Sequence, residues 1–92
     1  MSAVEKRMVV TSMDGVHLKP AQVFVETASA FEKAEVTVCR DGQEADGKSI
    51  LGLLSLGFSR DSELVVRVQG EDAEACLAAL EVALKKENVI DR

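Results

Sequence analysis

The spacing between apolar residues differs from one segment of this chain to the next, and this feature restricts the possible folds more than any other. Spacing of three and four residues predicts helices from Pro20 to Phe31 and from Glu71 onward. Short β-branched or alternating runs predict strands at residues 8–11, 34–40 and 64–68. Local order therefore alternates along the chain, which excludes an all-helical or an all-strand fold.

Two turn signals complete this pattern. Asp41-Gly42 predicts a two-residue hairpin, because both positions tolerate positive φ, and it would pair a short strand at 43–45 with the preceding one. Ser49 is a preferred N-cap residue and predicts a brief helix. The resulting order of strand, helix, strand, strand, helix, strand, helix predicts an α+β domain, with helices on one face of a mostly antiparallel sheet. The other face should be wetter and carry the basic residues in or beside strands, Lys6, Arg7, Arg40 and Arg67.

Size and charge exclude several classes of protein. The 92 residues correspond to one domain, 1–92, with residues 1–6 and 88–92 expected as loose ends. A net charge of −5, with neither Trp nor Tyr, argues against a nucleic-acid partner. No apolar run approaches the roughly 18–20 residues that span a bilayer, so no membrane insertion is expected. The charged N-terminus does not resemble a signal peptide, and we expect a cytoplasmic location.

Neither cysteine predicts a metal or redox site. Cys39 and Cys76 are far apart in the sequence and have no metal-binding spacing. We expect two small buried apolar side chains in a reducing compartment. A metal site at the single histidine would need these cysteines or distant carboxylates to converge, so no metal and no cofactor is expected.

His17 is the only histidine, and it lies between the Asp14-Gly15 turn and the predicted helix start at Pro20. The N–H groups and the dipole of a first helical turn favour an anion there. An unperturbed imidazole is largely neutral at pH 7 and therefore nucleophilic. A phosphoryl group on its nitrogen would be close to backbone N–H donors and to the Lys19 ammonium. This placement favours a role in which His17 carries a phosphoryl group covalently. An isolated histidine before a helix is more often a surface residue, so placement alone leaves both interpretations open.

The segment from Gly47 to Phe58 is unusually apolar for its length. A helix of about two turns cannot bury all its large apolar side chains on one face, so some are expected at the surface as a partner patch while the others fill the core. Ser49 is a simple N-cap in one interpretation. In the other it is phosphorylated, and its dianion at a helix N-terminus would alter the choice of partner.

Three segments together resemble the HPr family of histidine phosphocarriers, over about residues 8–86. The active-histidine pattern of the family, Gly-x-His-x-Arg-Pro-Ala, is matched by Gly15-Val16-His17-Leu18-Lys19-Pro20-Ala21. The regulatory-serine pattern is matched by Lys48-Ser49-Ile50-Leu51-Gly52 and the leucine-rich turn after it. Gly70-Glu71-Asp72, followed by an apolar helix, is also similar to the family. Each motif alone is weak, but three in this order and at these separations are specific.

The resemblance implies an open-faced β-sandwich in which a four-stranded antiparallel sheet carries three helices on one face, in the order β-α-β-β-α-β-α. It implies a phosphorylated intermediate of the bacterial phosphoenolpyruvate-dependent sugar phosphotransferase system rather than an enzyme. His17 would accept a phosphoryl group from enzyme I, on Nδ1 in the family, and pass it to EIIA domains. Lys19, with the first turn at Leu18 and Pro20, would stabilise that group.

The resemblance also implies regulation and docking. Ser49 matches the serine modified by HPr kinase/phosphorylase, which would connect the chain to catabolite regulation and a transcriptional regulator. Partners would dock on an apolar surface, which we place at Leu18, Lys48, Ile50, Leu51, Leu54 and Leu56. Lys19, Lys48 and Arg60 could form a basic rim for acidic partners. A monomer suits a carrier that must expose one surface to several partners.

One departure from the family pattern concerns the phosphoryl site. Lys19 stands where the family has arginine, so a flexible point charge replaces a planar fork. We expect slower or less favourable transfer, not its loss. One alternative function is a regulatory HPr-like protein that acts mainly through phosphorylation of Ser49. Another is a small α+β domain without phosphate chemistry, in which substitution of His17 would have no effect on transfer.

Overall fold

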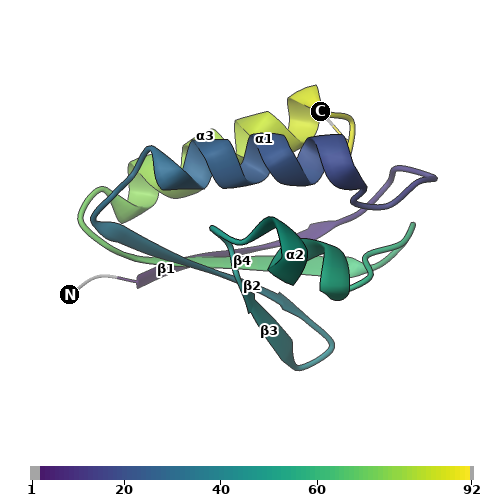
Figure 1. The fold of residues 1–92 in the computed structure, drawn as a ribbon, viewed down its shortest axis with the longest axis horizontal. Helices are drawn as coiled ribbons and strands as arrows, with labels where there is room; N and C mark the ends of the chain where they lie inside the picture. The colour runs from purple at the N-terminus through teal and green to yellow at the C-terminus, as the bar shows by residue number, and fades with distance from the viewer. Residues whose placement is uncertain (1–2, 92) are drawn as a thin grey trace.

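A computed structural model describes residues 3–91 and has the predicted order of elements. Figure 1 shows α1 and α3 side by side over one face of the sheet, with α2 nearer to β3. The elements are β1 (Ala3–Val9), α1 (Leu18–Ser29), β2 (Ala34–Arg40), β3 (Gln43–Asp46), α2 (Ile50–Ser55), β4 (Glu63–Gly70) and α3 (Ala73–Lys86).

The four strands form one antiparallel sheet in the order β1-β4-β2-β3. The central strand β4 pairs with β1 from Val9–Glu63 to Ala3–Gln69, and with β2 on its other side. Asp41 and Gly42 adopt positive φ, 48° and 80°, in the turn between β2 and β3, so the predicted hairpin is confirmed.

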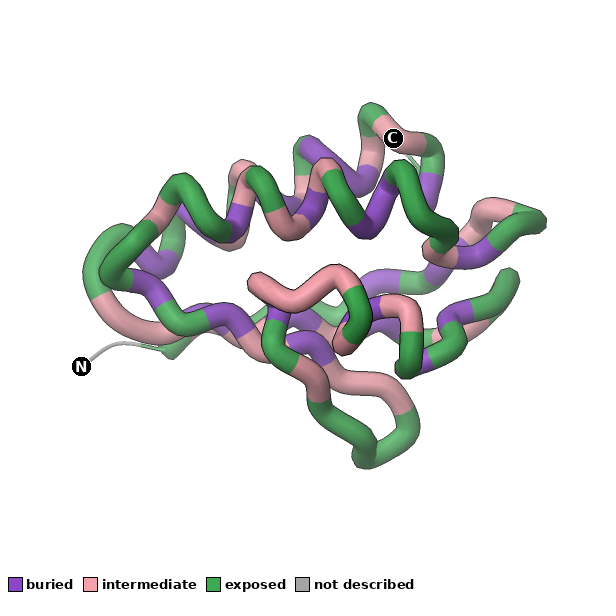
Figure 2. The backbone as a smooth tube through the Cα atoms, viewed as in Figure 1, coloured by how far each residue is buried: buried purple, intermediate pink, exposed green. Residues whose placement is uncertain are grey.

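The core lies between the helices and one face of the sheet. Alternate residues of β2 and β4 point into it, including Val38, Val66 and Val68, which are fully buried. Phe24 of α1 and Leu80 of α3 close it from the helix side. Figure 2 shows buried stretches of strand and helix facing the space between the two layers. Each such aliphatic or aromatic side chain stabilises the fold by about 1.5–3 kcal/mol relative to exposure.

The expectation of loose ends is wrong for residues 3–6 and 88–90. β1 begins at Ala3 rather than near Met8, because it is an edge strand that follows β4 for its whole length. Its charged residues hid this pairing from a search for apolar alternation. At the other end, Val89 is fully buried and Ile90 is nearly so, because the chain turns back onto the core after α3. Residues 1, 2 and 92 lie outside the described residues.

Two of the four strand-associated basic residues do not lie on the open face. The Lys6 ammonium is 2.8 Å from a carboxylate oxygen of Glu81 on α3. The Arg40 guanidinium donates a hydrogen bond of 3.1 Å to the Leu56 carbonyl at the end of α2. Lys6 and Arg40 occupy positions in their strands that point to the same face as the buried core residues. Each side chain extends past the edge of the core to a helix. Arg7 instead forms an ion pair with Glu63, and Arg67 forms one with Glu44. These four positions alternate with the core-facing positions of their strands, so they lie on the open face.

The two cysteines differ. Cys76 is fully buried in α3, as expected, whereas Cys39 is half-buried on β2 near Glu44 and is not a core residue. Burial is the main cause that raises the pKa of both thiols, so neither is activated as a thiolate. None of the helices within residues 3–91 has the length and apolar content needed to cross a membrane.

Glu81 should make part of the stability depend on pH. A hydrogen bond from Lys6 is the largest cause that lowers the pKa of this carboxyl, and Lys85, 3.2 Å away, lowers it further. Because the folded-state pKa is depressed, this stabilisation is present above the unfolded pKa and is lost as the pH falls through the folded value. Urea unfolding should therefore show a steeper loss of stability from about pH 5 to pH 3 in the intact protein than in Glu81→Gln. Glu74→Gln, an exposed carboxyl on the same helix, is the control, and identical slopes for intact and Glu81→Gln chains would contradict the prediction.

Candidate functional site

His17 is the N-cap residue of α1, with extended backbone at φ −98° and ψ −172°. Its carbonyl accepts the Ala21 N–H at 3.1 Å, which closes the first helical turn. Its side chain is exposed and makes no capping hydrogen bond, so the imidazole is accessible to a large partner. The predicted place between turn and helix is confirmed, although the helix begins at Leu18 rather than Pro20.

The first turn of α1 leaves few backbone donors for an anion on His17. Pro20 has no N–H, and the Ala21 N–H already bonds to the His17 carbonyl. The N–H groups of Leu18 and Lys19 are therefore the donors that the start of this helix offers. Lys19 is exposed, whereas Pro20 and Ala21 are buried and anchor the turn on the core. This arrangement can stabilise a phosphoryl group through two backbone donors, a helix dipole and one mobile ammonium.

The loop before His17 is held tightly against the segment that follows α2. Ser12 accepts two hydrogen bonds within this loop, from the Gly15 N–H to its carbonyl at 3.1 Å and from the Asp14 N–H to its hydroxyl at 3.2 Å. Gly15 has a φ of +64° and lies so close to Phe58 that a Cβ atom would overlap the Phe58 carbonyl oxygen. The sequence places Gly15 in a turn and in the HPr motif, but it does not indicate Phe58 as its partner.

The predicted docking residues divide into exposed and buried ones. Leu18 and Leu51 are 55% and 80% exposed. Ile50 and Leu54 are half-buried and pack against the core. Leu56 is only 5% exposed, and its place in the docking surface is wrong, because the C-terminal end of α2 turns it into the core. Met13, 83% exposed in the loop before His17, is a large apolar residue that the sequence analysis did not select.

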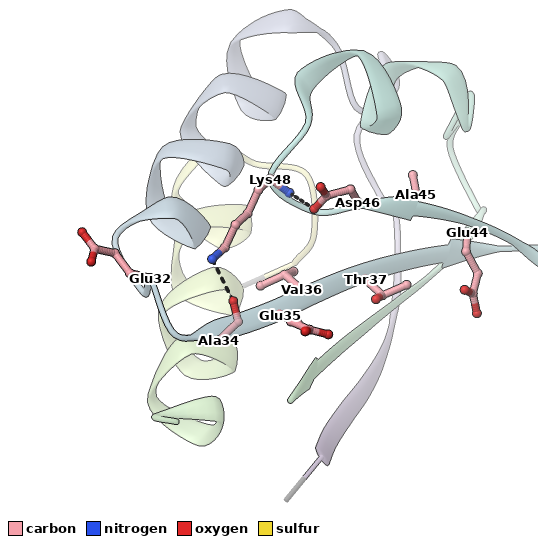
Figure 3. Close-up of a pocket in the computed structure, with 9 residues that line it drawn as sticks. All are labelled: Glu32, Ala34, Glu35, Val36, Thr37, Glu44, Ala45, Asp46 and Lys48. Carbon is pink, nitrogen blue, oxygen red and sulfur yellow. Dashed lines mark hydrogen bonds between the residues drawn. The ribbon is translucent and has the colours of Figure 1, made fainter. Parts of the chain in front are cut away.

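Lys48 does not offer a free charge to partners. Its ammonium donates hydrogen bonds to the carbonyls of Phe31 at 2.9 Å and Ala34 at 2.7 Å. Figure 3 shows the side chain reaching across a groove toward the start of β2, with Asp46 accepting from the Lys48 backbone N–H. Its assignment to the docking surface and the basic rim is therefore wrong, because these carbonyls hold the charge at the junction of α1 and β2. Arg60, by contrast, is exposed.

Ser49 is the N-cap of α2, as predicted. Its hydroxyl accepts the Gly52 N–H at 3.0 Å, and the residue is half-buried. Across residues 3–91, the structure brings together no group of three or more His, Cys, Asp and Glu side chains that could hold a metal ion.

Fold and site together define a class of small α+β protein that exposes one histidine at the N-terminus of a helix. The family model described as "PTS HPr component phosphorylation site" matches residues 4–86. The chain belongs to the HPr family, and its role is that of a phosphocarrier of the phosphotransferase system.

Known relatives agree with this assignment. The chain is 36% identical over 76 residues to the phosphocarrier protein HPr of Mycoplasma genitalium, covering 83% of this chain and 86% of that protein. The crystal structure of HPr from Bacillus anthracis matches with a TM-score of 0.81 and 34% identity, over 90% of this chain and 98% of that one.

A mycoplasma histidine-containing phosphocarrier matches with a TM-score of 0.93, over 97% of this chain and 100% of that one. At 21% identity it supports the fold alone. The matches do not favour the alternative in which serine regulation replaces phosphoryl transfer.

Gly15→Ala should destabilise the protein more than Gly42→Ala. Both glycines have positive φ, +64° and +80°, so an alanine at either incurs about 1–2 kcal/mol of backbone strain. Only at Gly15 would the new methyl group also overlap backbone, since nothing lies within 4 Å of the Cβ position at Gly42. Urea unfolding of the two variants measures the difference directly. Equal losses of unfolding free energy would show that the loop does not depend on its close contact with Phe58.

Proposed function

We propose that His17 accepts a phosphoryl group from enzyme I, charged by phosphoenolpyruvate, and passes it to EIIA domains for sugar uptake. The observation that carries this proposal is the exposed imidazole at the N-cap of α1, free of any capping bond. Family membership supports the general role. The resemblance of residues 15–21 to the HPr motif supports His17 as the acceptor and enzyme I and EIIA as its partners.

The transfer step needs no cofactor held by this chain. The lone pair of a neutral imidazole nitrogen, Nδ1 by resemblance to the family, attacks phosphorus as the bond from phosphorus to the donor atom of enzyme I breaks. The donor atom of enzyme I keeps the bonding electrons. In the second transfer a nucleophile of EIIA attacks the same phosphorus, the phosphorus–nitrogen bond breaks, and His17 keeps that electron pair. His17 thus carries the phosphoryl group covalently between two proteins. The rate of each transfer depends on alignment of the attacking atom, the phosphorus and the leaving atom.

The phosphoryl group would be stabilised mainly by backbone. The N–H groups of Leu18 and Lys19, with the dipole of α1, favour its negative charge. The Lys19 ammonium adds one charge-assisted contact, whereas Pro20 and Ala21 shape the turn from below. These contacts are few and open to solvent, which suits a group that must leave again.

Partners would dock on the exposed apolar side chains beside the histidine. Leu18, Leu51 and Met13 are the exposed members of this surface, and Ile50 and Leu54 are half-buried. We expect a transient interface with a small buried area, because the same surface must serve successive partners. A monomeric, cytoplasmic protein suits this exchange.

Ser49 is proposed as a regulatory phosphorylation site for an ATP-dependent HPr kinase/phosphorylase, with a transcriptional regulator as reader of the modified form. Its hydroxyl accepts from the Gly52 N–H, so a phosphate there would keep a backbone donor. The added negative charge would lie next to the exposed Leu51 and could weaken docking without unfolding α2.

Phosphorus NMR tests the carrier role. The intact protein, incubated with enzyme I, magnesium and phosphoenolpyruvate, should give an acid-labile phosphohistidine signal that is absent in His17→Ala. The exposed side chain at position 17 makes no capping bond, so the variant should keep the fold. Absence of the signal from folded intact protein, with enzyme I of proven activity from the same source, would overturn the proposal.

Lys19→Arg should strengthen the site. A guanidinium presents a planar fork to phosphate, and one further charge-assisted contact is expected to contribute about 1 kcal/mol. The phosphohistidine lifetime, or the transfer rate from enzyme I, should therefore rise about fivefold. Lys33→Arg, an exposed lysine beyond the opposite end of α1, is the matched control and should change neither quantity. The explanation fails if Lys19→Arg also leaves both unchanged.

A further inference from the structure

After α3 the chain turns back and reaches the loop that carries His17. Asn88 adopts a φ of 60°, in the left-handed region, and the Val89 N–H then donates to the Leu84 carbonyl at 2.9 Å. In Figure 1 the yellow end of the chain lies beside the start of α1. We call residues 88–90 the C-terminal turn.

The carbonyl of Val89 is the contact between this turn and the loop. It accepts the Thr11 N–H at 2.8 Å, the Ser12 N–H at 3.3 Å and the Thr11 hydroxyl at 3.4 Å. Val89 is fully buried and Ile90 is 6% exposed, so the acceptor lies at the edge of the core. Hydrogen bonds shielded from water in this way resist opening more than bonds on an exposed loop.

From Ser12 the restraint continues to the histidine through short backbone steps. The Ser12 carbonyl accepts the Gly15 N–H. Gly15, which is two residues before His17, lies against Phe58. The imidazole makes no capping bond, so its place in space is set by this backbone and by the first turn of α1. A shift of the Thr11–Ser12 backbone would therefore move the nucleophile.

We propose that the C-terminal turn is a positioning element for phosphoryl transfer, in which the Val89 carbonyl holds the loop that places His17. This inference rests on the proposed carrier function and adds a residue outside the histidine and serine motifs. An error of about 1 Å in the place of a reacting group can cost on the order of 100-fold in rate. Loosening the turn should thus reduce the transfer rate constant and leave partner docking intact.

Two substitutions at Asn88 provide a matched test. Asn88 is exposed, so neither variant removes a core side chain. Glycine accepts a φ of 60° freely, whereas valine, branched at Cβ, strongly disfavours it. In assays with enzyme I, Asn88→Val should lower the transfer rate constant at saturation about tenfold, with the KM for this protein within about twofold. Asn88→Gly, which preserves the turn, should retain both parameters.

A third variant separates positioning from general loss of stability. Val68→Ala removes a buried side chain from β4, near its pairing with Val4 at the end of the sheet remote from the Val9–Glu63 pair. It should destabilise the fold yet transfer at the intact rate, in conditions where circular dichroism shows all chains folded. If Val68→Ala and Asn88→Val slow transfer equally, the effect follows stability, and the proposal is overturned.

Hydrogen exchange gives a readout that does not depend on enzyme I. The amides of Thr11 and Ser12 should be protected in the intact chain and in Asn88→Gly, and should lose protection in Asn88→Val. Failure of the intact protein to accept phosphate would refute the carrier function, whereas these amides report on the turn alone. Intact transfer by Asn88→Val would overturn the inference about positioning.

Discussion

The pairing of the central strand β4 on both of its edges determines where the chemistry of this protein can take place. Antiparallel pairing brings the end of β1 beside the start of β4, with Val9 opposite Glu63. Val10 continues the ladder, donating to the Ser62 carbonyl and accepting from the Asp61 N–H. The chain leaving β1 and the chain entering β4 therefore meet at one end of the sheet. The histidine loop and the segment after α2 are these two connections, so their contact at Gly15 and Phe58 follows from the register.

A site built this way is open by construction. The helices cover one face of the sheet, and the histidine loop lies at the end of the sheet, where β1 finishes. Chemistry there must be completed by a second protein that supplies the phosphoryl group and excludes water. An acceptor with few stabilising groups on its own surface suits this task, because a carrier that held the phosphoryl group strongly would release it slowly.

Local patterns were sufficient to predict most of the fold. The bounds of β2, the Asp41-Gly42 hairpin and the N-cap at Ser49 follow from alternation, turn residues and capping, which act over a few neighbours. β1 was found only in part because its charged residues conceal an edge strand. The roles of Lys48, Arg40 and Leu56 depend on carbonyls and core surfaces brought near by tertiary structure, so their residue types could not reveal them. The C-terminal turn had two local sequence signals, Asn88 after the helix and two apolar residues near the chain end, but neither indicates which loop the turn contacts.

Position and electrostatic stabilisation are separable at His17. The loop is placed by backbone contacts, through the Val89 carbonyl, the Ser12 turn and the Phe58 segment, none of which involves the side chain at position 19. Lysine at that position can therefore alter how strongly a phosphoryl group is stabilised without moving the imidazole. Conversely, the strain that Asn88→Val introduces displaces the loop without altering the charges around the histidine. The departure from the family pattern at Lys19 should thus alter phosphoryl transfer by changing how strongly the group is stabilised, while the turn at Asn88 alters it by changing where the imidazole lies.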